Sequence, residues 1–271
     1  MMRSHLNITT VNVKGINDPE KMDQAIKWTI DNEIDILLLS ETKINLQNAS
    51  FNFKHTLQAN FDFNPKTPHS APLLAIWSHN ENHPRGNGIG MILNAETIGN
   101  HFFKKSELPG RCLSIFTKHS NKQTIVITCI YGPADKDRQT KKDIVSFIKK
   151  LPRGDNISHI IGGDLNEAPN HTHTPIHNAL TEMNLVNTHW ISKTPHKHTF
   201  RHPTHDTNSQ IDHLFISSQL LPREQEVLEH DIAEYFITDH TPVSAKIWPQ
   251  FITTKRLSKP KLPSETLFNT S

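Results

Sequence analysis

The chain is a succession of short apolar runs separated by polar breaks, and most runs have the length and periodicity of β-strands. Residues 6–13 alternate apolar and polar positions and stop at Gly15, whereas residues 34–39 form a continuous apolar run that ends in Ser40-Glu41-Thr42. Further strands are predicted at residues 73–77, 89–93, 113–117, 124–131, 157–161, 211–216, 226–230 and 243–248.

Three segments carry helical signals. Asp18 can cap a helix that has Pro19 at its first position, and in which Met22, Ile26 and Ile30 recur on one face. A second helix is predicted over residues 136–151 and a short third one over residues 175–183. Many strands and few helices, without regular alternation of the two, predict two packed sheets covered by helices.

The composition is that of an ordered protein, and it changes only near the end of the chain. Hydrophobic residues make up 35% and charged residues 21% of the 271 residues, which is polar for a globular protein but not disordered in bulk. We expect one catalytic domain over residues 1–250, followed by a basic, proline-containing tail or linker over residues 251–271. That tail could lead into a further domain of a larger polyprotein.

Neither the cysteines nor the amino terminus points to secretion. Cys112 and Cys129 both lie in apolar strand-like segments and are interpreted as core residues. Residues 1–12 lack the apolar stretch of a signal peptide, and no run approaches the roughly 18 apolar residues of a membrane span. We therefore expect an intracellular, monomeric protein with no membrane partner. The net charge of +2 is too small to indicate a nucleic-acid partner by itself.

Five short polar motifs lie at the ends of predicted strands. They are Asn12, Glu41, the pair Asp164 and Asn166, Asp212 with His213, and Asp239 with His240. Each motif alone can be explained as a turn or as solvated residues. Asp164 and Asn166 follow two glycines, and they would share one face if the strand continued. A carboxylate beside a carboxamide can orient water at a phosphate.

Taken in order along the chain, these motifs resemble those of the endonuclease/exonuclease/phosphatase superfamily, over roughly residues 6–248. The chain is most similar to the endonuclease domains of non-LTR retrotransposons and to abasic-site endonucleases. The matching motifs are Glu41-Thr42-Lys43, Tyr131-Gly132-Pro133, Gly163-Asp164-Leu165-Asn166, Ser209-Gln210-Ile211-Asp212-His213 and Thr238-Asp239-His240-Thr241-Pro242. The resemblance implies an α/β (α+β) fold, a four-layered sandwich in which two mainly antiparallel sheets pack face to face between helices, with one active site between the sheets.

The resemblance also implies a magnesium-dependent phosphodiesterase, in the first place a DNA endonuclease that leaves 3′-hydroxyl and 5′-phosphate ends. Glu41 would be the main Mg²⁺ ligand, with Asn12 close by and Asp239 in or near the coordination shell, and Mn²⁺ could substitute. Asp164 would activate or position the attacking water. Asn166 would hold that water and a phosphate oxygen.

The remaining implied roles concern the phosphate. His240, oriented by Asp212, would donate to the phosphate, and Tyr131 would approach the same group. An imidazole paired with a carboxylate stays protonated more readily, and a phosphodiester transition state needs donors on its equatorial oxygens. The implied partner is nucleic acid, with DNA preferred, and the implied place of action is the nucleus.

Lys14 departs from the family pattern, because abasic-site endonucleases carry an acidic residue here and retrotransposon enzymes often an asparagine. A charged lysine cannot bind Mg²⁺, which puts any second metal position in question. Lys14 either neutralises a substrate phosphate or is simply exposed.

Other substrate contacts are predicted in two loops. Arg85 and Asn87 are flanked by glycines and suit phosphate contact, although an ordinary hairpin turn has the same pattern. Phe200 and Arg201 lie in the loop-like stretch 192–210, which is rich in cations and histidines and could follow a phosphate backbone. Phe200 would stack on a displaced base or pack in the core.

Alternative functions remain for the same residues. The core motifs could serve an RNA nuclease, a phosphatase or phospholipid phosphodiesterase, or a catalytically inactive nucleic-acid-binding relative. Ile211-Asp212-His213 stands where inositol-phosphate phosphatases typically carry a Cys-Asp-Arg signature, which argues against that branch. His171, His173 and His177 have a spacing that suggests zinc, but no cysteine or second cluster completes a tetrahedral set.

Overall fold

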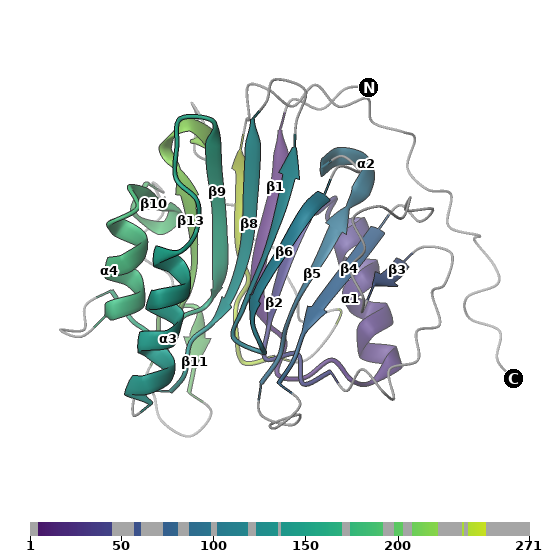
Figure 1. Ribbon diagram of the computed structural model, residues 1–271. Helices are drawn as coiled ribbons and strands as arrows, with labels where there is room; N and C mark the ends of the chain where they lie inside the picture. Colours follow the sequence, from purple (N-terminus) through teal and green to yellow (C-terminus); the bar gives the residue numbers. More distant parts are fainter. Residues whose placement is uncertain are drawn as a thin grey trace, which may run out of the picture.

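Two six-stranded sheets pack face to face, with helices on both outer sides (Figure 1). The computed structural model describes residues 5–44, 57–60, 73–80, 87–98, 102–118, 123–134, 137–169, 174–191, 198–202, 208–221, 235 and 238–247. The order of the first sheet is β14-β1-β2-β5-β4-β3. Its strands are β1 (Leu6–Asn12), β2 (Ile36–Ser40), β3 (Leu57–Asn60), β4 (Leu73–Ser78), β5 (Ile89–Asn94) and β14 (Val243–Ile247).

The second sheet has the order β10-β13-β9-β8-β7-β6. Its strands are β6 (Phe102–Leu108), β7 (Cys112–Lys118), β8 (Thr124–Tyr131), β9 (Ile157–Asp164), β10 (Leu185–Asn187) and β13 (Asp212–Ser217). Among the described strands, the parallel pairs are β1 with β2, β3 with β4, and β8 with β9, so both sheets are mainly antiparallel, as expected. A separate two-stranded ribbon joins β11 (Phe200–Arg201) to β12 (Asn208–Ser209).

The helices of the described residues are α1 (Pro19–Asp31), α2 (Ala95–Ile98), α3 (Arg138–Lys149), α4 (Pro175–Thr181), α5 (Thr188–Ile191) and the 3-10 turn η1 (Ser218–Leu220). The predicted cap of α1 is confirmed, because the Asp18 side chain accepts a hydrogen bond from the backbone N–H of Glu20 at 2.9 Å. None of these helices is long and apolar enough to span a membrane.

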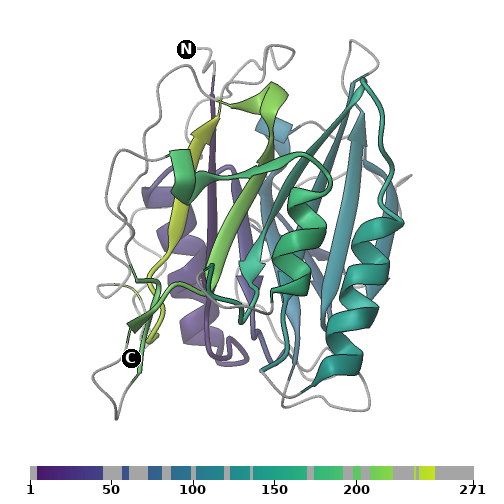
Figure 2. The same ribbon diagram turned by 90° about the vertical axis from the view of Figure 1, so that its left-hand side faces the viewer.

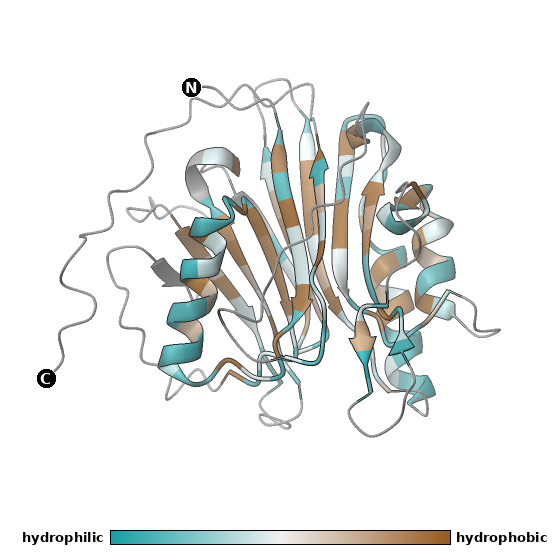
Figure 3. Cartoon of the chain, turned by 180° about the vertical axis from the view of Figure 1, so that it is seen from behind, coloured by the Kyte–Doolittle hydropathy of each residue, from teal (hydrophilic) through white to brown (hydrophobic). Residues whose placement is uncertain are grey.

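Three apolar interfaces hold the layers together. Ile8 of the first sheet and Ile160 of the second lie in the core between the sheets. Ile26 of α1 packs on the outer face of the first sheet. Ile148 of α3 and Ile176 of α4 pack on the outer face of the second sheet (Figure 2). The strands are mainly hydrophobic, whereas much of the helix surface is hydrophilic (Figure 3). The four-layered sandwich is thereby confirmed.

Several elements differ from the sequence prediction. The stretch 192–210 is not entirely a loop, because the ribbon of β11 and β12 lies within it. Strand β6 was not predicted. It lies at the edge of its sheet and contains lysines and a glutamate, so apolar and polar residues alternate only weakly along it. Cys112 and Cys129 are buried and free, as expected. The predicted strand 226–230 and the tail 251–271 lie outside the described residues.

Gly90 of β5 is required by the ring of Trp77 on the neighbouring strand. The two residues are opposite each other in the ladder, and Trp77 is fully buried. A Cβ at residue 90 would lie 2.2 Å from Trp77 Cε3 and Cζ3, far inside van der Waals contact. The indole therefore fills the space that a side chain would need.

We predict that Gly90→Ala lowers the free energy of unfolding by about 1–3 kcal/mol, because the added methyl group overpacks the core. Chemical denaturation monitored by circular dichroism measures the change. In a Trp77→Leu background the same substitution should cost less, since the ring that it meets is gone. Equal costs in both backgrounds would show that the ring is not the constraint.

Candidate active site

The residues between the two sheets change from apolar to polar at one end of the sandwich. On β9, Ile160 lies in the inter-sheet core, and Asp164 is four positions further along the same face. On the neighbouring strand β13, Leu214 lies in that core and Asp212 is two positions before it. The ladder places Asp212 opposite Asp164, and Tyr131 of β8 is also the partner of Asp164.

Gly163 and Gly132 allow neighbouring backbone segments to pack closely together at this end of the sheet. A Cβ at Gly163, whose φ is +147°, would lie 1.8 Å from the backbone oxygen of Ile130, and one at Gly132 would lie 1.9 Å from that of Leu165. The glycine before Asp164 thus serves close packing of strands. Asn166 has φ +50°, so the strand ends at Asp164 and does not continue through Asn166. The two side chains are related by a tight turn, in which the Asn166 N–H donates to Asp164 Oδ1 at 2.9 Å.

Asn12 links the two sheets across the site. It is buried at the end of β1, and its Nδ2 donates to Glu41 Oε2 at 3.0 Å and to Asp164 Oδ2 at 2.9 Å. Its Oδ1 accepts the backbone N–H of Lys14 at 2.9 Å. Three of the predicted site residues, Asn12, Glu41 and Asp164, are therefore in one hydrogen-bonded group.

The turns around the site have unusual backbone conformations. Lys14, Glu41, Lys43 and Asn166 are four of the six non-glycine residues with positive φ in the described part of the chain. Such residues are uncommon, and each costs free energy that the surrounding structure must supply. Here the loop after β1 and the loop after β2 are joined by the hydrogen bond from the N–H of Gly15 to the oxygen of Glu41 at 2.7 Å.

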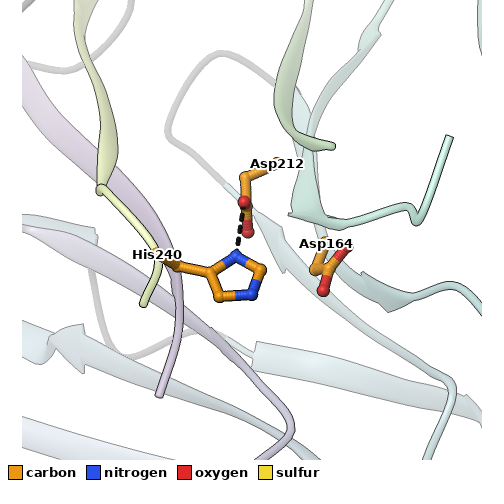
Figure 4. Close-up of side chains that lie close together, drawn as sticks. All are labelled: Asp164, Asp212 and His240. Atoms are coloured by element: carbon orange, nitrogen blue, oxygen red, sulfur yellow. Dashed lines mark hydrogen bonds and ion pairs between the residues drawn. The ribbon is translucent and has the colours of Figure 1, made fainter. Parts of the chain in front are cut away.

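His240 is held as a cation by Asp212. Its Nδ1 lies 2.7 Å from Asp212 Oδ2, and both side chains are buried (Figure 4). Burial lowers the pKa of His240, but the charge and hydrogen bond of Asp212, with the charges of Asp164 and Asp239, outweigh it and raise the pKa to about 9. Asp212 is fixed in turn by the hydroxyl of Thr199, which accepts its backbone N–H at 3.0 Å.

Asp164 lies beside this pair and forms no ion pair with any described cation (Figure 4). Burial raises the pKa of its carboxyl, and the charge of Asp212 raises it further, to about 7, although His240 and Asn12 act in the opposite direction. A carboxylate and an imidazolium that titrate near and above neutral pH are therefore adjacent. That combination suits proton transfer.

Two lysines neutralise the outer carboxylates. Lys43 Nζ lies 2.7 Å from Glu41 Oε1, and Lys14 Nζ lies 2.6 Å from Asp239 Oδ2. Burial raises the pKa of Glu41, but the hydrogen bonds from Lys43 and Asn12 lower it more, so the pKa is below its ordinary value. Burial also raises the pKa of Asp239, but the Lys14 hydrogen bond, a backbone hydrogen bond and the charges of His240 and Lys14 together lower it more. Both carboxylates are therefore ionised at neutral pH.

Arg111 is a site residue that the sequence analysis missed. It lies in the turn between β6 and β7, with its Cζ 4.9 Å from the ring centroid of Tyr131 and its Nη1 3.2 Å from the oxygen of Gly132. Burial raises the pKa of Tyr131, as do the charges of Glu41 and Asp164. The phenol thus stays protonated as a donor. Only spatial proximity reveals Arg111, because no sequence motif surrounds it.

A buried network behind the site was also missed. The Glu167 carboxylate pairs with Lys141 of α3 at 3.6 Å and accepts the N–H groups of Ile176 and His177 at the start of α4. His213 Nε2 lies 2.9 Å from the backbone oxygen of Glu167. Burial lowers the pKa of His213 to about 3, so this ring is neutral. The network fixes the chain immediately after Asn166 and beside Asp212.

The donor set suits a hard divalent cation. The polar atoms of Asp164, Asp212 and His240 lie within 4.8 Å of one another. The protonated His240 cannot be a ligand, but Glu41 is linked to Asp164 through Asn12 and adds a further carboxylate. Carboxylate and amide oxygens are the ligands of Mg²⁺ and similar ions. The buried Asp212 Oδ1 has no hydrogen-bond partner among the described residues. Asp164, in contrast to Asp212, has no cation of its own among the described residues, so a divalent ion held by Glu41 would offset its charge.

The structure places some of the predicted substrate-binding residues beside the site and others away from it or outside the described residues. Phe200 forms a β-bridge with His240, and their ring centroids are 4.9 Å apart. Arg201 is exposed on the same short strand. Asn87 lies against the turn at Gly110, whereas Arg85 is outside the described residues.

The loop that carries Arg85 and Asn87 was predicted to contact substrate, but one of its glycines is needed for close packing. A Cβ at Gly88 would lie 2.6 Å from the hydroxyl of Thr42, next to Glu41. Of the three histidines with zinc-like spacing, His177 is buried with its ring centroid 4.9 Å from that of Phe215. His171 and His173 lie outside the described residues.

Several solved structures share this fold. AP endonuclease LMAP from Leishmania major has a TM-score of 0.64 at 13% identity, over 90% of this chain and 88% of that one. TDP2 from D. rerio, complexed with a single-strand DNA product, has a TM-score of 0.62 at 14% identity, over 90% and 99%. The endonuclease domain of TRAS1, a telomere-specific non-LTR retrotransposon, has a TM-score of 0.59 at 13% identity, over 91% and 99%.

At these identities the likeness establishes the fold alone. No curated protein sequence matches the chain. A profile of the endonuclease/exonuclease/phosphatase family, in contrast, matches residues 9–240, a span that contains every site residue from Asn12 to His240. The chain belongs to the endonuclease/exonuclease/phosphatase family.

Proposed function

We propose that the protein is a Mg²⁺-dependent DNA endonuclease that hydrolyses a phosphodiester by in-line attack of water, leaving 3′-hydroxyl and 5′-phosphate ends. Members of its family are typically hydrolases of phosphodiester bonds. The observation that carries the proposal is the adjacency of Asp164, with a pKa of about 7, to the His240 imidazolium that Asp212 holds. The Asp164 carboxylate can take a proton from water while the His240 imidazolium donates a hydrogen bond to the phosphate.

Asp164 positions the water and accepts its proton. Its Oδ1 and Oδ2 are oriented by Asn166 and Asn12, which fixes the direction of the base. The Asn166 carboxamide donates one N–H to the oxygen of Gly132 at 2.9 Å and has a second N–H and an oxygen for water and phosphate. His240 Nε2 and the Tyr131 hydroxyl donate to the phosphate oxygens.

Glu41 and Asn12 would hold the divalent ion, which supplies charge for the developing oxyanion and for the leaving oxygen. Mg²⁺ fits the oxygen-rich donors, and Mn²⁺ should substitute. Binding at Glu41 requires the Lys43 ammonium to give up its place on Oε1. Lys43 and the Arg111 guanidinium would then face a polyanion, which supports nucleic acid as the substrate.

DNA is preferred because the sequence motifs and the fold resemble DNA-processing enzymes, among them a retrotransposon endonuclease domain. A nuclear place of action, a monomeric state and a larger parent polyprotein are parts of the same proposal. Phe200, packed on His240, and Arg201 beside it would meet the nucleotide next to the scissile phosphate.

Asp164→Ala and His240→Ala should each reduce the nicking rate of supercoiled plasmid by at least roughly a hundredfold, because each removes a group that acts in the transition state. Gel-based initial rates with Mg²⁺ measure the loss. Asp155→Ala is the matched control, since Asp155 is exposed in the turn before β9, at the opposite end from Asp164. Full nicking by either site variant would refute its role.

The nicking rate should follow a bell-shaped pH profile. Asp164 must be ionised, so the rate falls as pH drops through about 7, and His240 must be protonated, so the rate falls as pH rises through about 9. Asp212→Asn should move the alkaline limb to lower pH, because the imidazolium loses its charged partner. Rates measured from about pH 5 to about pH 10 test this, and an unmoved alkaline limb contradicts it.

The substrate class is tested with supercoiled DNA, abasic duplex DNA, single-stranded RNA and a phospholipid, each with Mg²⁺ and with EDTA. We expect Mg²⁺-dependent nicking of DNA and no turnover in EDTA. Turnover of RNA or phospholipid alone would overturn DNA as the proposed substrate but would leave the proposed hydrolysis of a phosphodiester intact. Equal DNA cleavage in EDTA would overturn the metal dependence.

A further inference from the structure

Every acid at the site except one has its own protein cation. The pairs are Glu41 with Lys43, Asp212 with His240 and Asp239 with Lys14, at 2.7, 2.7 and 2.6 Å. Asp164 is the exception among the described residues. The uncompensated negative charge is therefore on the Asp164 side of the site, which Asn12 joins to Glu41. The Asp239 side is already neutralised.

The backbone fixes Lys14 in this position. Lys14 has φ +52°, and its N–H donates to Asn12 Oδ1 at 2.9 Å. The next N–H, of Gly15, donates to the oxygen of Glu41 at 2.7 Å. The base of the lysine side chain is thus tied to the same two residues that would hold the metal ion.

The backbone of Asp239 is fixed from the other side. Its oxygen accepts the N–H of Arg201 at 3.2 Å, and the hydroxyl of the preceding Thr238 donates to the oxygen of Asn12 at 2.7 Å. Lys14 and Asp239, which are far apart in sequence, are therefore both anchored at the end of β1. The fold thus holds the backbones of the two residues where the Lys14 ammonium can reach the Asp239 carboxylate.

Asp239 is a poor position for a divalent ion in this arrangement. One carboxylate oxygen lies on Lys14, and the other lies 3.9 Å from His240 Nε2. An incoming ion would have to displace the first cation and would be repelled by the second. At Glu41 the ion displaces Lys43 but gains the unpaired charge of Asp164. The balance of charge thus favours Glu41 over Asp239.

We propose that Lys14 is a built-in cation that keeps divalent ions off Asp239, so that the centre binds a single metal ion, at Glu41. Asp239 then acts as a positioning residue for the Lys14 ammonium and His240, in place of the ligand role expected from the sequence. The ammonium supplies the positive charge on that side of the scissile phosphate. This inference rests on the proposed metal-dependent function.

The test is the number of Mn²⁺ ions bound per chain, measured by electron paramagnetic resonance on the full chain without nucleic acid. Wild type should bind one ion. Lys14→Met frees Asp239 and should add a second, weaker site, whereas Lys14→Arg keeps a cation there and should bind one. The double variant Lys14→Met with Asp239→Asn should return to one. Circular dichroism checks that each variant is folded, and Lys14 is half exposed, so its side chain does not support the core.

The outcomes separate the two proposals. Two ions on wild type, or one ion on folded Lys14→Met, would overturn the role of Lys14 and leave the nuclease function intact. No ion on any variant would overturn the proposed metal-dependent function and this inference with it. A second ion that persists in the double variant would show that its site is not Asp239, and would also overturn the inference.

Discussion

The two-residue repeat of side chains along paired strands is the constraint on which the site depends. Because β9 and β13 keep their inward faces in register, the positions that carry Ile160 and Leu214 inside the core carry Asp164 and Asp212 at its end. A slip of one residue would turn both carboxylates toward the helices. The glycines near this end let the strands approach closely enough to hold that register. The apolar core and the polar centre are thus one continuous arrangement.

Charge compensation is what allows so many acids to gather there. Burial of Asp212 and Asp164 costs free energy unless partners offset it. His240 does so for Asp212, while Asn12 and a backbone N–H do so only partly for Asp164, whose pKa is raised in consequence. Each partner comes from a different segment of the chain. The electrostatics therefore bind the first strand, the middle of the second sheet and the last loop into one unit.

Much of the fold follows from local patterns in the sequence. The cap and apolar spacing of α1, and the buried runs of the central strands, carry enough information because local propensity and burial agree. Strand β6 and the ribbon at Phe200 were missed because an edge strand and a two-residue pairing leave little pattern.

The site residues, too, fall into those that the sequence predicts and those that it does not. Motif order was enough to nominate the residues that the structure gathers around Asp164, from Asn12 to His240. Arg111, the buried ion pair of Glu167 and the partnership of Lys14 with Asp239 depend on contacts between distant segments, which a single sequence does not display. The bridge between Phe200 and His240 has a consequence for synthesis. His240 completes the centre and β14 completes the ladder of the first sheet, and both lie late in the chain. A growing chain therefore has no assembled centre until the residues up to Ile247 have left the ribosome.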